Sequence, residues 1–324
     1  TIPIRDITIQ RRENDLVAGS FGRGIFILDD ITPIRNFNNN IATTEATLFP
    51  VKEVKWYGQS SRVGSQGDAE WIAKNPPFGA NFTYFMADNI KSKKDIRKEK
   101  EKKGNVKFPG WDALEEESRQ DGPSVLLIIK DENGKVINTV NGTNKKGFNR
   151  VNWSLTYPNK SGERLQVPRG RGGFRGGGVM ATPGNYTVTL VKRVDGENTV
   201  LQGPDLFRVE PLFDGSLPRK SFKEMDAFRD AAFAFQQDLT ATNIALSRSQ
   251  QTVDAMLRAF DKATSPSDDL LKRLNDTKIA LLDIDKELNG DAIKGEIGER
   301  SNPTASDGNS LARNALGNTY GPTD

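Results

Sequence analysis

The chain of 324 residues contains no cysteine and no histidine. The two absences exclude disulfides, thiolate nucleophiles, imidazole acids and bases, and the Cys and His ligands of structural zinc sites. Catalytic triads of the Ser-His-Asp and Cys-His kinds are excluded for the same reason. A chain without cysteine also suits an oxidising compartment, because it cannot form stray disulfides there.

Long hydrophobic runs are absent as well. No segment of the sequence approaches the ~20 apolar residues that span a bilayer. Hydrophobic residues make up 35% of the chain, which is low for one compact core, so we expect two or three units with many loops and solvated helices. The 46 basic side chains nearly balance the 43 acidic ones, and the overall charge therefore does not favour nucleic acid as a partner.

Short strands and turns alternate from residue 4 to residue 30. A free three-stranded meander is only marginally stable, so we expect further sheet to cover it. Gly22-Arg23-Gly24 suits a tight turn with positive φ, and Asp29-Asp30 can accept backbone N–H groups where the last strand ends. We assign these five residues a structural role. A catalytic pair of carboxylates is disfavoured, because Asp29 and Asp30 are neighbours on a strand and should point to opposite faces.

Residues 15–33, DLVAGSFGRGIFILDDITP, carry a family resemblance. They resemble the signature that closes the propeller in bacterial sortilin-like (BNR-repeat) proteins, which are often labelled glycosyl hydrolases. Phe21 stands where the family usually has His, and Phe26 where it usually has Trp. The resemblance implies that residues 1–36 are the last strands of an upstream β-propeller of the same protein. It also implies export to the periplasm, to the outer membrane or out of the cell.

Residues 37–215 read as a β-sandwich that follows an Asn-rich linker at 36–40. We expect strands at 46–50, 54–57, 82–86, 124–130, 135–140, 147–155 and 183–190, with a hairpin turn at Asn133-Gly134. The last two segments resemble an immunoglobulin-like sandwich of the FlgD type, which implies core positions for Trp153, Tyr186, Val188 and Leu190. A charged insertion at 91–121 interrupts the strands, with a solvated helix or disordered stretch at 91–103 and a short acidic helix at 111–119.

A Gly/Arg loop at 168–178 supplies the candidate partner-binding residues Arg169, Arg171, Phe174 and Arg175. Arginines spaced by glycine beside an aromatic residue are also typical of flexible nucleic-acid-binding segments. One short copy inside a hairpin loop argues against nucleic acid and for a flexible surface loop. Contacts with an envelope protein, a membrane surface or an anionic glycan remain the alternatives.

Residues 219–290 change to a helical period, beginning with the capping box Ser221-x-x-Glu224. The apolar stripe of the first helix follows steps of three and four through Met225, Phe228, Ala232, Phe235, Leu239, Thr242, Leu246, Val253, Met256 and Phe260. A second helix starts near 265–268, and its stripe comprises Leu270, Leu274, Leu281, Ile284 and Leu288. We expect an antiparallel helical hairpin for packing or docking, followed at 291–324 by a polar, mostly irregular tail with a short helix at 311–316.

The sequence contains no Asp-box, P-loop, metal-ligand cluster or nucleophile elbow. We therefore predict no catalytic residue, metal or cofactor in this chain. The expected fold class is multidomain, mainly β plus α: terminal propeller blade strands, an Ig-like sandwich and a helical hairpin. The expected function is a non-catalytic binding or scaffold portion that mediates protein–protein or glycan contacts. The alternative is a propeller glycoside hydrolase whose paired carboxylates lie in upstream blades.

Overall fold

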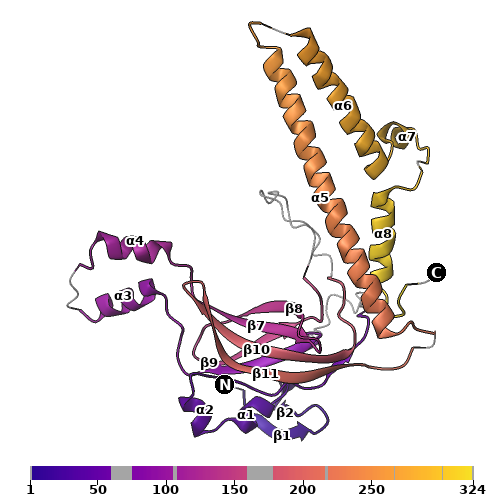
Figure 1. Ribbon diagram of the computed structural model, residues 1–324. Coiled ribbons are helices and arrows are strands. Elements are labelled where there is room, and N and C mark those ends of the chain that lie inside the picture. Colours follow the sequence, from indigo (N-terminus) through magenta and orange to yellow (C-terminus); the bar gives the residue numbers. More distant parts are fainter. Residues whose placement is uncertain are drawn as a thin grey trace. The chain divides into compact units, whose positions relative to one another are not determined.

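The structure is a computed structural model that describes residues 2–59, 75–104, 108–158, 178–215, 218–265, 267–300 and 302–322. The chain divides into two compact units (Figure 1). The first comprises Thr1–Tyr157 with Pro183–Phe213, and the second comprises Pro158–Thr182 with Asp214–Asp324. The described strands all lie in the first unit, together with four helices, and the described part of the second unit is helical, so the protein is multidomain with β plus α structure.

The first unit opens with a three-stranded antiparallel meander, as the sequence predicted. Its strands, in the order in which they pair, are β1 (Ile4–Gln10), β2 (Asp15–Ser20) and β3 (Ile25–Leu28). Two short helices follow, α1 (Thr32–Asn36) and α2 (Asn39–Thr43). The Asn-rich stretch expected to be a linker is thus partly helical, because the Asn38 side chain accepts the N–H groups of Asn40 and Ile41 and so caps α2.

Two further sheets form the rest of the first unit (Figure 1). The five-stranded sheet has the order β5 (Val54–Trp56), β11 (Glu197–Pro211), β10 (Gly184–Val194), β7 (Ser124–Asp131) and β8 (Val136–Gly142). The three-stranded sheet has the order β4 (Ala46–Leu48), β6 (Ala80–Met86) and β9 (Gly147–Trp153). All pairs are antiparallel except β5 with β11. The expected strands are therefore present, and β11 is an additional one.

The inner faces of these two sheets share one core. The Trp153 ring of β9 lies 5.5 Å from Tyr186 of β10 and 6.2 Å from Phe207 of β11, measured between ring centroids. All three side chains are buried, and so are the predicted core residues Val188 and Leu190. Gln202 of β11 adds a polar link between the sheets, because its side chain accepts the N–H of Leu48 and donates to the Leu48 carbonyl.

The charged insertion contains two helices, α3 (Lys93–Lys102) and α4 (Trp111–Arg119). They lie beside each other and away from the strands of the first unit (Figure 1). Ser92 and Asp95 form a capping box at the start of α3. The stretch expected to be either helix or disorder is therefore a helix at 93–102, and the acidic helix lies where it was predicted.

The second unit consists of α5 (Phe222–Phe260), α6 (Asp268–Asn289), α7 (Ala292–Glu296) and α8 (Ala305–Leu316). Figure 1 shows α6 running back alongside α5. Two side-chain pairs fix this register: Lys278 of α6 contacts Asp254 of α5 at 3.1 Å, and Asn289 contacts Asn243 at 2.8 Å. The predicted capping box is present, and α8 packs against both long helices.

The buried stripe of α5 differs from the predicted one. Leu239, Leu246 and Val253 are buried as expected, whereas Phe235 and Met256 are 42% and 51% exposed. The remaining buried residues of α5 are Arg229 and Phe233. On α6, Leu274 is buried, while Leu270 and Ile284 are exposed.

Contacts from distant parts of the chain explain this difference at the start of α5. Thr182 donates its hydroxyl to Asp226 at 2.8 Å, and the Lys220 N–H donates to the Tyr320 carbonyl at 3.0 Å. The first turns of α5 are thus covered by segments before β10 and after α8, and not by α6 alone. The predicted apolar stripe assumed that only the second helix packs against α5, so it could not account for contacts with these other segments.

Candidate functional site

The loop between β2 and β3 contains the predicted glycine turn. Gly22 and Gly24 have φ of 74° and 87°, the left-handed region that glycine adopts readily. The Ser20 N–H and hydroxyl both donate to the Gly24 carbonyl, at 3.1 and 2.7 Å. Arg23 is exposed at the tip of the loop. The backbone of Gly22 and Gly24 thus has the positive φ that the sequence predicted, and the structural role of the turn stays a prediction.

The chain turns sharply after β3 at Asp29 and Asp30. The Asp30 carboxylate accepts the N–H of Thr32 at 3.1 Å and the Thr32 hydroxyl at 2.5 Å, while the Asp30 N–H donates to the Asp15 carboxylate at 2.8 Å. Asp30 has φ of 47°, an uncommon value for a residue with a β-carbon. The placement of the two aspartates on a strand was wrong, because β3 ends at Leu28. Of the two carboxylates, that of Asp30 accepts a backbone N–H, and the structural role of the pair stays a prediction.

Arg150 of β9 connects this corner to the sheet formed by β4, β6 and β9. Its guanidinium donates to the carbonyls of Asp29 at 3.0 Å and Asp30 at 3.1 Å, and its Nε donates to the Thr83 hydroxyl at 3.2 Å. Sequence reasoning placed Arg150 in a strand and gave it no further role. Nothing local indicates this contact, because the partner carbonyls lie 120 residues or more away along the chain.

Two more contacts attach the meander to the sandwich. Lys52 donates to the Glu13 carboxylate at 3.0 Å, and this hydrogen bond is the main reason why the pKa of Glu13 lies below its ordinary value. Phe37, which follows α1, packs against Phe85 and Phe148 at centroid distances of 4.9 and 5.2 Å. The meander is therefore anchored at its ends and corners.

Both broad faces of the meander expose apolar side chains. Pairing places Ile7 and Ile9 of β1, Leu16 and Ala18 of β2, and Phe26 and Leu28 of β3 on one face, because directly opposed residues share a face. The other face carries Val17, Ile25 and Ile27, next to the polar Asp6, Thr8 and Gln10 of β1. Ile7, Phe26, Ile25 and Ile27 are 59%, 46%, 69% and 62% exposed. Monomeric proteins rarely expose contiguous apolar patches of this kind, so both faces are candidate interaction surfaces.

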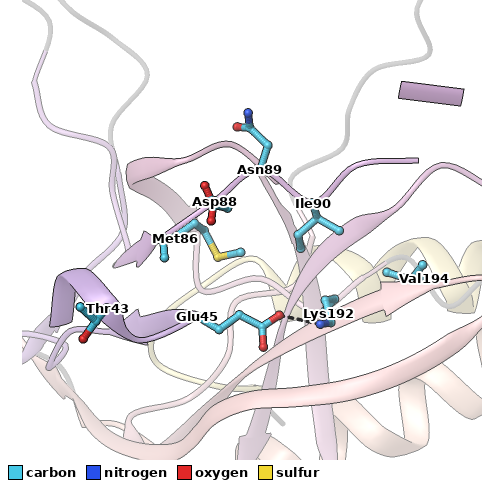
Figure 2. A pocket seen from close by; sticks show the side chains of 9 residues that line it. Thr43, Glu45, Met86, Asp88, Asn89, Ile90, Lys192 and Val194 are labelled. Atoms are coloured by element: carbon cyan, nitrogen blue, oxygen red, sulfur yellow. Dashed lines mark hydrogen bonds and ion pairs between the residues drawn. The ribbon is translucent and has the colours of Figure 1, made fainter. Parts of the chain in front are cut away.

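A cavity of ≈ 460 Å³ lies where the ends of β6 and β10 meet α2 (Figure 2). Its wall includes Met86, Ile90 and an ion pair at 2.6 Å between Glu45 and Lys192. Asp88 and Asn89 also line it (Figure 2), but each already bonds Lys146. The Thr43 hydroxyl also lines the cavity and donates to the Asn40 carbonyl at 2.9 Å, so the charged groups of the wall and this hydroxyl are already bonded within the protein.

The other predicted contact residues, Arg169, Arg171, Phe174 and Arg175, lie outside the described residues. Within the described part of the chain, no group of three or more acidic side chains is arranged to hold a metal ion. None of the helices described is both long and apolar enough to cross a bilayer.

Comparisons with known proteins leave the family open. No family model and no curated protein matches this chain. Among solved structures, the chain is similar to the dimeric latent PorU of Porphyromonas gingivalis, with 12% sequence identity and a TM-score of 0.23. The likeness covers 61% of this chain and only 12% of the PorU chain. At this TM-score it supports no conclusion about fold or function.

Proposed function

We propose that this chain is a non-catalytic binding or scaffold portion of an exported protein of the sortilin-like β-propeller type. In this proposal β1–β3 are propeller strands, β4–β11 form an immunoglobulin-like sandwich, and α5 with α6 forms an antiparallel hairpin. The chain then supplies contacts with other proteins or glycans rather than chemistry.

The two exposed apolar faces of β1–β3 are the observation that carries this proposal. A sheet at the surface of a sandwich buries one face and leaves the other polar. In a propeller, by contrast, each sheet lies between two others, so both of its faces must be apolar. Ile7 and Phe26 on one face with Ile25 and Ile27 on the other fit the second arrangement.

The resemblance at residues 15–33 supports the same assignment. Its conserved frame falls on the β2–β3 loop and on the corner at Asp30, where the side chains support local geometry. Such turn-forming residues are needed at the ends of β2 and β3, where the chain leaves the sheet. The carboxylates of Asp15 and Asp30 are engaged by backbone N–H groups and by the Thr32 hydroxyl, which fits a structural role better than catalysis.

Paired substitutions on the two faces test the proposal. Ile7→Thr/Phe26→Thr alters one face and Ile25→Thr/Ile27→Thr alters the other. In the natural gene product in full, each pair should lower the stability by about 2–4 kcal/mol, since burying one such side chain contributes ~1.5–3 kcal/mol. In the 324-residue chain both pairs should change the stability by less than about 0.5 kcal/mol, because the residues are exposed there. Urea denaturation of both proteins measures the difference.

The control pair is Val200→Thr/Leu206→Thr on β11, where the side chains are 60% and 69% exposed. It should be neutral in both proteins. A gene product in which only the first face is sensitive would indicate a two-layer sandwich, and one in which neither face is sensitive would remove the basis for a propeller.

A further inference from the structure

The helix α3 is an unusually basic part of the first unit, and it lies beside the acidic helix α4. Between Lys91 and Lys103 the sequence has eight basic side chains and three acidic ones. Hydrogen bonds and ion pairs within this region decide which of these charges are compensated. The proposed function gives the pair no role.

The acidic side chains of α3 are all engaged within the protein. Asp95 accepts the N–H and hydroxyl of Ser92 in the capping box. Glu99 contacts Lys91 at 2.6 Å, and Glu101 contacts Arg97 at 2.5 Å. None of the three therefore neutralises the outer lysines of the helix by a direct ion pair.

One face of α3 is turned toward α4. Lys93, Ile96, Arg97 and Lys100 line the groove between the two helices. Arg97 bonds Glu117 through two nitrogens, at 2.7 and 2.8 Å, and this bond lowers the pKa of Glu117. Lys93 bonds Glu116 at 2.5 Å. The basic groups on this face are thus largely compensated by α4.

The opposite face of α3 carries Lys94, Lys98 and Lys102. They are spaced by four residues, so they form a row along one side of the helix. All three are exposed, and among the described residues none of them forms an ion pair. The row is a stripe of exposed positive charge without direct ion pairs among the described residues, although Lys94 and Lys98 lie near enough to Glu117 of α4 to lower its pKa.

An exposed aromatic pair lies at the start of α4. Trp111 is 78% exposed and Phe108 is 62% exposed, and their rings meet edge to face with centroids 5.2 Å apart. The pair is absent from the lining of the groove between the helices. Exposed aromatic rings next to a basic helix are typical of an interaction site. The partner that suits both is a surface with an apolar layer and negative charge.

From these observations we propose that α3–α4 docks on the surface of an anionic phospholipid bilayer. Lys94, Lys98 and Lys102 would contact lipid phosphates, while Phe108 and Trp111 would enter the boundary between headgroups and acyl chains. Tryptophan and phenylalanine are favoured at that depth, and lysines near an anionic bilayer are attracted to it. A soluble polyanion such as a nucleic acid would satisfy the lysines but would give the two rings no apolar environment, unless its bases stacked on them.

Vesicle co-sedimentation of the 324-residue chain tests the proposal. The protein should bind vesicles of equimolar phosphatidylglycerol and phosphatidylcholine, and bind pure phosphatidylcholine at least tenfold more weakly. Binding should weaken strongly at about 0.5 M NaCl, where charges are screened beyond a few ångströms. Lys94→Gln/Lys98→Gln/Lys102→Gln should weaken binding to anionic vesicles by about 100-fold, at roughly fivefold for each lysine. Phe108→Ala/Trp111→Ala should weaken it by at least about tenfold.

Matched controls separate docking from general charge effects. Lys262→Gln/Lys272→Gln/Lys294→Gln removes three exposed lysines of the second unit and should leave binding within about twofold. Asp112→Asn removes a negative charge beside Trp111 and should strengthen binding. Trp111→Phe/Trp71→Phe should keep most of the binding but lose the blue shift of tryptophan fluorescence that vesicles induce in the Trp71→Phe variant, because the two remaining tryptophans, Trp56 and Trp153, are buried.

Several outcomes would overturn the proposal. Absence of binding to anionic vesicles at low salt would do so, and so would equal binding to both vesicle types. Equal losses in the two lysine triples would show that the stripe is not the contact. Binding of mixed-sequence single-stranded DNA through the α3 lysines, without vesicle binding, would assign the surface to nucleic acid instead.

Discussion

The guanidinium of Arg150 donates to the backbone carbonyl of Asp30 at 3.1 Å, across 120 residues of sequence. A second nitrogen of the same group donates to the Asp29 carbonyl at 3.0 Å. Asp30 itself has a left-handed backbone and bonds Thr32 through its carboxylate. One arginine of β9 thus holds the corner that follows the meander, and this corner is one of the points at which the meander is attached to the rest of the first unit.

Replacement of Arg150 by lysine should loosen the meander without unfolding the sandwich. An ammonium group cannot direct two planar N–H bonds to two carbonyls as the guanidinium does. We expect a local loss of about 1 kcal/mol, the usual contribution of a hydrogen bond. Hydrogen exchange should become faster at residues 15–31, while β6, β9 and β10 keep their protection.

The matched control for this change is Arg193→Lys. Arg193 bonds Asn198 at the end of the β10–β11 hairpin, at 2.8 Å, and has no contact with the meander. Exchange at residues 15–31 should not change in this variant. Equal acceleration in both variants would mean that Arg150 does not anchor the corner.

Substitutions at Asp30 should rank by how well each residue tolerates φ of 47° and accepts the Thr32 N–H. Asparagine does both, glycine does only the first, and alanine does neither. Asp30→Asn should therefore change the unfolding free energy least and Asp30→Gly more, while Asp30→Ala should lower it by about 1–2 kcal/mol. Urea denaturation followed by hydrogen exchange in β2 and β3 gives these values.

Asp131→Ala is the companion variant. The Asp131 carboxylate also accepts two backbone N–H groups in a turn, from Asn133 and Lys135, but its backbone is not left-handed. It should therefore destabilise the protein less than Asp30→Ala. An Asp30→Ala variant as stable as Asp30→Asn would show that neither φ nor the carboxylate matters at this corner.

The sequence predicted those elements whose signals are local. Asn133-Gly134 predicted the β7–β8 hairpin, in which Gly134 has φ of 77°. Ser221 and Glu224 predicted the start of α5, because three residues suffice to define a capping box. The alternation at Tyr186, Val188 and Leu190 predicted their burial, since every second strand residue faces the core.

Elements defined by distant partners could not be predicted in this way. Strand β11 contains Gly203-Pro204, a pair that usually breaks strands. The pairing register explains its tolerance: Val188 pairs with Asp205 and Leu190 with Gln202, so that Gly203 and Pro204 fall in an irregularity of the ladder. Arg150 was missed for a similar reason, because only the folded chain brings β9 to the Asp30 corner.

Alanine substitutions in α5 should distinguish the observed buried stripe from the predicted one. Leu246 is 6% exposed and Met256 is 51% exposed, although both belong to the stripe expected from the sequence. Leu246→Ala should lower the unfolding free energy of the helical unit by about 2–5 kcal/mol, because it leaves a cavity. Met256→Ala should change it by less than about 1 kcal/mol. Circular dichroism during urea denaturation measures both free energies. Equal losses would contradict the observed burial of Leu246 and exposure of Met256.

The capping box of α5 should make the helical unit sensitive to acid. The Glu224 carboxylate accepts the Ser221 N–H at 2.8 Å and the Ser221 hydroxyl at 2.7 Å, and these bonds, the hydroxyl foremost, lower its pKa from the ordinary value of 4.5. A carboxyl whose pKa is lower in the folded state adds stability above its unfolded-state pKa. That contribution is lost as the pH falls through the lower, folded-state value.

Glu224→Gln should remove this acid dependence, since glutamine can still bond Ser221 but does not ionise. We expect the variant to melt at a lower temperature than the unaltered protein above pH 4.5, with a difference that shrinks as the pH falls below that value. Thermal melts followed by circular dichroism over this range measure the difference. Glu287→Gln, at an exposed position of α6 outside any capping box, is the control and should keep the acid dependence of the unaltered protein. If both variants follow the same pH profile, the acid sensitivity does not come from the Glu224 cap.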